Sequence, residues 1–170
     1  MRLNHTGVVP GERLDVSGEV VNESSRDIDG VNIILLETSI FKKKHITSTR
    51  KVLEIKRGKV DPYTTHSLDG TVITIPSLAP SMVTSLMNVS YWLKLEVELQ
   101  GFDLEAQILL IVGTVPMPRI FGQFGPLCVS AMQHWGEARM EKKERKEKYR
   151  GDVEFTPLYK VYQHCQAEKH

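Results

Sequence analysis

The sequence predicts an all-β fold, with an antiparallel β-sandwich in residues 1–116 and a tail of a different kind in residues 117–170. Three observations support this prediction. Apolar and polar residues alternate along several short segments, which is typical of strands. Turns that contain glycine or proline separate these segments. The pattern then stops at Val115-Pro116-Met117-Pro118, where two prolines end a strand.

The first expected element is a turn that opens a strand. In Val9-Pro10-Gly11-Glu12 the proline presets φ at the second turn position and the glycine accepts a positive φ at the third, which is typical of a type II turn. From Leu14 to Val20 the apolar residues alternate with polar ones, so one face of this strand is expected to meet water. Asn22-Glu23-Ser24-Ser25 ends it.

A buried strand and its return are expected next. The run Val31-Asn32-Ile33-Ile34-Leu35-Leu36 is short and rich in branched residues, which favours a buried strand over a helix. This strand continues to Phe41 and ends at Lys42-Lys43-Lys44-His45. Apolar residues among Lys and Arg near Val52 then indicate the return strand.

Three further strands complete the predicted sandwich. A short one around Ile73 is stopped by Pro76. The clearest alternation in the chain runs from Val89 to Leu99, and Gln100-Gly101-Phe102-Asp103 then predicts a hairpin turn into an apolar strand from Glu105 to Val112. About seven strands result, the number typical of an immunoglobulin-like sandwich.

The tail is predicted to contain a charged helix at about residues 131–148. Glu141 and Arg145, like Glu144 and Lys148, lie four positions apart, where opposite charges attract on a helix. Little apolar face follows Met140, and the residues from Gly151 onward are expected to be irregular.

Composition and charge limit the classes of function that the chain can have. The chain has 170 residues, and 22 Lys and Arg against 21 Asp and Glu give a net charge of +1, which argues against a general nucleic-acid binder. Cys128 and Cys165 lie outside the strand-rich part, so no disulfide joins the sheets and a reducing compartment is favoured. The N-terminus lacks an apolar signal region and no run of 18 apolar residues occurs, so a cytoplasmic protein is expected.

A glycosylation pattern in the sequence favours a secreted protein instead. Asn4-His5-Thr6, Asn22-Glu23-Ser24 and Asn88-Val89-Ser90 match the glycosylation pattern, which has meaning only for a secreted protein. The alternative is therefore a secreted or cell-surface immunoglobulin-like binding module. Glycan occupancy at Asn22 would separate the two.

Catalytic and metal-binding patterns are weak or missing. Six histidines are scattered without zinc-ligand spacing, and Asp27-Ile28-Asp29-Gly30 lacks the remaining ligands of a calcium loop. The sequence contains no nucleophile elbow, phosphate loop or dinucleotide fingerprint. We therefore expect no metal, no cofactor and no enzymatic activity.

Five short motifs, in order, resemble the C-terminal domain of arrestins of the arrestin domain-containing (alpha-arrestin) type. Each is weak alone, but their order and spacing are specific, and together they cover about two-thirds of the chain. At Val8 the family usually has an aromatic residue. The motifs are Gly7-Val8-Val9-Pro10-Gly11-Glu12, Asn22-Glu23-Ser24-Ser25, Ile75-Pro76-Ser77-Leu78-Ala79-Pro80-Ser81, Val89-Ser90-Tyr91-Trp92-Leu93-Lys94 and Ile111-Val112-Gly113-Thr114-Val115-Pro116.

The resemblance implies a non-enzymatic cytosolic adaptor in the endocytosis and ubiquitination of membrane-protein cargo, peripheral at the plasma membrane or endosomes. Arrestins have two sandwiches and only the second is matched, so a fragment or short form is expected, with an N-terminal arrestin domain as partner. Relatives bind thioredoxin through a cysteine in this sandwich. No cysteine lies between residues 1 and 127, so this partner is not implied.

Lys42, Lys43 and Lys44 form the centre of the strongest local charge patch. Lysines at a hairpin end can serve only to protect a sheet edge. They can also attract acidic phospholipid headgroups or a phosphorylated receptor tail, which is the role that the resemblance implies.

The segment Phe155-Thr156-Pro157-Leu158-Tyr159 is the candidate partner-binding site. Tails of the family carry Pro-Pro-x-Tyr, which docks on WW domains of HECT-type ubiquitin ligases. Here Pro157 and Tyr159 match that motif, whereas Thr156 replaces the first proline. The alternative is that Phe155 packs with Leu158 on the sandwich.

Overall fold

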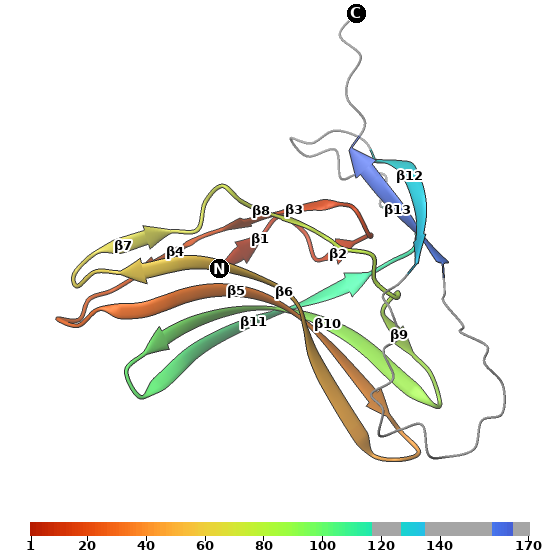
Figure 1. The fold of residues 1–170 in the computed structure, drawn as a ribbon, viewed down its shortest axis with the longest axis horizontal. Coiled ribbons are helices and arrows are strands. Elements are labelled where there is room, and N and C mark those ends of the chain that lie inside the picture. Colours follow the sequence, from red (N-terminus) through yellow and green to blue (C-terminus); the bar gives the residue numbers. More distant parts are fainter. Residues whose placement is uncertain (117–126, 135–157, 165–170) are drawn as a thin grey trace, which may run out of the picture.

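The computed structural model describes residues 1–116, 127–134 and 158–164, and this part of the chain contains strands and no helix. Figure 1 shows them as a ribbon. The strands are β1 (Arg2–Leu3), β2 (Gly7–Val8), β3 (Arg13–Ser17), β4 (Glu19–Val21), β5 (Ile28–Phe41), β6 (Ile46–Val60), β7 (Thr65–Ser67), β8 (Thr71–Thr74), β9 (Met82–Val83), β10 (Met87–Leu99), β11 (Phe102–Val112), β12 (Leu127–His134) and β13 (Leu158–His164).

The strands form two layers around one core, as the sequence predicted. One layer is a sheet in the order β2-β11-β10-β5-β6, with β9 paired to β10. The facing layer consists of β1-β3-β8 and β4-β7, which lie above the long strands in Figure 1. All pairs are antiparallel except β11 with β2, which is parallel. The all-β sandwich is therefore confirmed.

The first turn and strand match the prediction, with one difference. The amide of Glu12 donates to the carbonyl of Val9 at 3.1 Å and Gly11 has a φ of 88°. The expected single strand is broken at Gly18, where φ is 130°. As a result β3 pairs with β8, whereas β4 pairs with β7.

Strand β10 forms the centre of the core. It lies between β5 and β11, and its alternation places one row of side chains between the layers. The row was predicted to comprise Tyr91, Leu93, Leu95, Val97 and Leu99. The first four are at most 8% exposed, as is Val89, whereas Leu99 at the end of the strand is only partly buried. The predicted hairpin turn is also present, since Leu99 pairs with Phe102 and Gly101 has a φ of 96°.

The tail prediction was wrong where the structure describes it. Residues 131–134, expected to begin a helix, belong to β12, and the segment expected to be irregular contains β13. These two strands pair antiparallel, from Leu127 opposite His164 to His134 opposite Leu158. Pairing with a distant strand overrides a local helical charge pattern. The remainder of the predicted helix, residues 135–148, lies outside the described residues.

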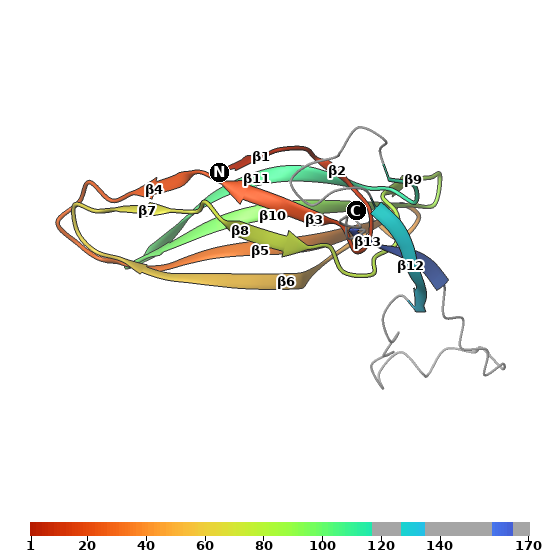
Figure 2. The same cartoon turned by 90° about the horizontal axis from the view of Figure 1, so that it is seen from above.

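Tyr162 of β13 attaches this hairpin to the sandwich. Its amide donates to the carbonyl of Pro10 at 2.8 Å, and its hydroxyl donates to the carbonyl of Thr114 at 2.9 Å. A β-carbon at Gly11 would collide with the backbone of Tyr162, so only glycine fits this turn. The hairpin lies at the end of the sandwich away from the β10–β11 turn (Figures 1 and 2).

Candidate functional site

The predicted lysine patch lies at the tip of the β5–β6 hairpin. The two strands pair up to Phe41 opposite Ile46, and residues 42–45 form the connecting turn. The amide of Lys44 donates to the carbonyl of Phe41 at 3.3 Å, and His45 has a φ of 51°. The tight turn directs the lysines away from the sandwich, and Lys42, Lys43 and Lys44 are all exposed.

A second loop lies against this turn. The amide of Lys42 donates to the carbonyl of Leu86 at 2.9 Å, and its ammonium donates to the carbonyl of Thr84 at 2.6 Å. Neither contact neutralises the charge of Lys42. Within residues 1–116, 127–134 and 158–164, no acidic side chain forms an ion pair with Lys42, Lys43 or Lys44.

Exposed apolar side chains surround the lysines. Phe41, Ile46, Leu86 and Val83 are 42%, 50%, 55% and 81% exposed. Pairing of Phe41 with Met87 brings these two segments together. We call this surface the basic end; its residues are Lys42, Lys43, Lys44, Phe41, Ile46, Val83 and Leu86. It combines positive charge with apolar area at one place.

A buried acid behind the basic end is neutralised internally. Glu37 accepts a hydrogen bond from Arg50 at 2.8 Å and one from the hydroxyl of Tyr91 at 3.3 Å. The hydrogen bond to Glu37 raises the pKa of the Arg50 guanidinium, and the two side chains form an ion pair. Glu37 therefore contributes no free negative charge to the lysines.

The other predicted site is described only in part. Phe155 and Pro157 lie outside the described residues. Tyr159 lies in β13, where its backbone is paired with Gln133 of β12. Leu158 and Tyr159 are thus part of a two-stranded sheet.

Sequence reasoning missed a charged cluster on the outer face of β10. The Lys94 ammonium donates to Glu96 at 2.6 Å and to Glu105 at 2.8 Å. Partial burial lowers the pKa of Lys94, but the hydrogen bonds to the two acids outweigh this effect and the pKa is raised. The hydrogen bond from Lys94 lowers the pKa of Glu96. The polar residues that alternate with the apolar ones along β10 could have indicated this cluster.

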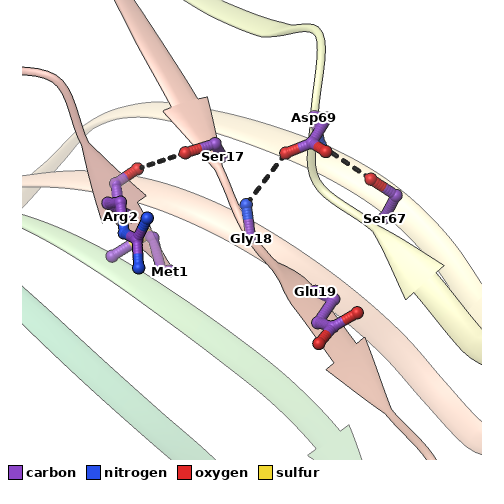
Figure 3. A pocket seen from close by; sticks show the side chains of 7 residues that line it. All are labelled: Met1, Arg2, Ser17, Gly18, Glu19, Ser67 and Asp69. Carbon is purple, nitrogen blue, oxygen red and sulfur yellow. Dashed lines mark hydrogen bonds between the residues drawn. The ribbon is translucent and has the colours of Figure 1, made fainter.

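A shallow hollow lies where the first strand is broken, and Figure 3 shows its residues. The amide of Gly18 donates to the carboxylate of Asp69 at 3.0 Å, and the amide of Asp69 donates to the hydroxyl of Ser67 at 3.1 Å. The hydroxyl of Ser17 donates to the carbonyl of Arg2 at 3.4 Å. These contacts hold the bend at Gly18 in place.

Metal-ligand clusters and membrane-spanning helices are both absent from the described ranges. No group of three or more His, Cys, Asp or Glu there could hold a metal ion. No helix in that part of the chain has the length and apolarity needed to cross a bilayer.

The glycosylation pattern at Asn22 conflicts with the fold. The Asn22 side chain is buried, and its amide nitrogen donates to the carbonyl of Arg26 at 2.8 Å and to that of Asp61 at 3.0 Å. A glycan is attached to this nitrogen and needs an exposed site. Asn22 therefore has a structural role in the folded domain, which weakens the secreted alternative.

The described residues thus form a two-layer β-sandwich with an exposed basic hairpin. Residues 1–117 match the family described as "Arrestin (or S-antigen), C-terminal domain". Arrestin domain-containing protein 17 of Caenorhabditis elegans is 30% identical over 123 residues, which cover 68% of this chain and 28% of that relative. The chain belongs to the arrestin family, among the arrestin domain-containing proteins. Proteins of this family are in general non-enzymatic adaptors.

Proposed function

We propose that the chain is a cytoplasmic adaptor in membrane-protein trafficking, which meets an acidic membrane surface through the basic end. Family membership supports the adaptor role. The observation that carries the membrane contact is the set of three exposed lysines without acidic partners among the described residues, next to exposed Phe41, Ile46, Val83 and Leu86. Membrane-protein cargo and an N-terminal arrestin domain are the partners that this role requires.

Electrostatics and apolar burial act together at such a surface. Each lysine near an acidic leaflet contributes about 1 kcal/mol, and this contribution falls as salt screens the charges. Apolar side chains beside the lysines gain about 25 cal/mol for each Å² that they bury in the interface. The basic end therefore fits vesicles that contain acidic phospholipids better than neutral ones.

Replacing Lys42, Lys43 and Lys44 together by alanine should weaken binding to vesicles with acidic inositol lipids by roughly 30- to 100-fold. The remaining binding should depend less on salt. Vesicle co-sedimentation at two salt concentrations measures both effects.

The matched control replaces Lys51, Lys56 and Lys59 of β6 by alanine, which removes the same charge away from the hairpin tip. This variant should retain most of the binding. Equal losses in the two triple variants would show that net charge alone attracts the protein. No loss in the Lys42, Lys43 and Lys44 variant would limit these lysines to edge protection.

We also propose that the tail recruits a WW-domain ubiquitin ligase through Phe155, Pro157 and Tyr159. A proline in an extended segment lowers the entropy cost of docking, and a tyrosine two positions later fills an aromatic-lined groove. Thr156 in place of the first proline weakens this docking.

In a peptide of residues 150–164, Thr156→Pro should tighten WW binding by about 10- to 100-fold, or about 1.4–2.8 kcal/mol. Tyr159→Ala should abolish binding because it removes the groove-filling side chain. Calorimetric titration of the peptides against a WW domain measures both. If the Thr156→Pro peptide does not bind, the sequence around it forbids recognition and the ligase proposal fails.

A further inference from the structure

Strand β11 leaves most of its outer edge unpaired in the described part of the chain. The amide of Ile111 donates outward to Thr6 at 2.8 Å, and that of Gly113 donates outward to Val8 at 2.8 Å. Strand β2 pairs only with Ile111 and Val112. Because backbone groups alternate along a strand, the odd-numbered residues from Asp103 to Leu109 direct their N–H and C=O groups outward without a partner there.

The two edges of this sheet differ in protection. The opposite edge strand, β6, carries five basic residues that discourage pairing with another strand: Arg50, Lys51, Lys56, Arg57 and Lys59. Strand β11 has no lysine or arginine. Four of its apolar side chains are instead 44–61% exposed: Phe102, Leu104, Leu109 and Ile111. Asp103 and Glu105 are the charged residues of β11. An exposed edge with apolar side chains and no basic residue is a template for another strand.

Geometry limits how a second β11 could pair with this edge. In an antiparallel pair, outward-directed residues must face each other, so a twofold axis must pass through a residue. An axis at Glu105 would place two carboxylates directly opposite each other, which is unfavourable. An axis at Gln107 would place Asp103 of the second copy opposite Ile111, whose outward groups already bind β2.

An axis at Ala106 avoids both like charges opposite each other and residues already paired with β2. It is the midpoint of the free stretch from Phe102 to Leu110. It places Leu104 opposite Ile108 on one face of the sheet and Glu105 opposite Gln107 on the other. No two like charges then face each other, and the outward backbone groups from residue 103 to residue 109 find partners.

We propose that two copies of this chain associate by antiparallel pairing of their β11 strands about Ala106. The dimer joins the two large sheets into one continuous sheet. The interaction is distinct from the membrane contact, because the β10–β11 hairpin and the basic end are different surfaces (Figure 1).

Charge changes at Gln107 should shift the dimer dissociation constant in opposite directions. Gln107 of each copy faces Glu105 of the other, so the dimer contains this pair twice. Gln107→Lys should tighten dimerisation of the full chain by about 2- to 30-fold, and Gln107→Glu should weaken it by a similar factor. Analytical ultracentrifugation over a range of concentrations measures the dissociation constant. The controls Gln100→Lys and Gln100→Glu make the same charge changes in the hairpin turn and should have little effect.

Hydrogen exchange gives an independent readout at single residues. The even-numbered amides of β11 face β10 and should be protected at every concentration. The amides of Asp103, Glu105, Gln107 and Leu109 should become protected only as the chain dimerises. A chain that stays monomeric would overturn the proposal. So would the reversed charge response, which indicates pairing with the basic β6 edge of another copy and an open assembly.

Discussion

Leu95→Ala is expected to lower the free energy of unfolding by about 2–5 kcal/mol, as large-to-small changes in a core do. Leu95 is buried on β10, where it lies between Ile33 of β5 and Ala106 of β11. The loss has two parts, the transfer of the removed methyl groups and the cavity between the layers. Urea denaturation followed by fluorescence measures it.

Leu86→Ala is the matched control, because it makes the same chemical change at a side chain that is 55% exposed. It should change the free energy of unfolding by no more than about 0.5 kcal/mol. Equal stability of the Leu95→Ala variant and the parent would contradict the packing of the two sheets.

Gly11→Ala should destabilise the chain and release the β12–β13 hairpin. At a φ of 88° a side chain costs about 1–2 kcal/mol. In addition, the new β-carbon would collide with the Tyr162 backbone, so Tyr162 must leave Pro10. Hydrogen exchange of the Tyr162 amide, which donates to Pro10 in the parent, should accelerate strongly.

The Gly58→Ala variant separates the effect of backbone strain from that of the collision with Tyr162. Gly58 has a similar φ of 92°, but no atom lies within 4 Å of its added β-carbon. This variant should lose a similar amount of stability to backbone strain and keep the Tyr162 amide protected. If both variants left that amide protected, the contact between the hairpin and the first turn would not exist in solution.

Local patterns account for the parts of the fold that the sequence predicted. The turn at Gly11 depends on neighbouring residues, and β10 repeats its alternation over enough positions to define both faces. Strand β12 had no such signal, because its partner β13 is distant in sequence and its own residues precede a charged run that favours a helix. The break at Gly18 was likewise not predictable locally, because the residues before it pair with β8 and those after it pair with β7.

The candidate site could be predicted only in part for the same reason. Three adjacent lysines are visible as a charge run in the sequence. The apolar half of the basic end is not, because the loop that contains Thr84 reaches Lys42 from 42 positions away. Only the pairing of β5 with β10 brings the two segments together.

The attachment of Tyr162 to the first turn would compete with the proposed docking of a WW domain on the tail. Tyr159 and Tyr162 both lie in β13. A WW domain that requires an unpaired Tyr159 can therefore bind only after β13 separates from β12 and Tyr162 leaves the first turn. The apparent affinity of the whole chain is then the affinity of the isolated peptide multiplied by the population in which β13 is undone. A change at Gly11, far from the motif in sequence, would thus raise the affinity for the ligase by increasing that population.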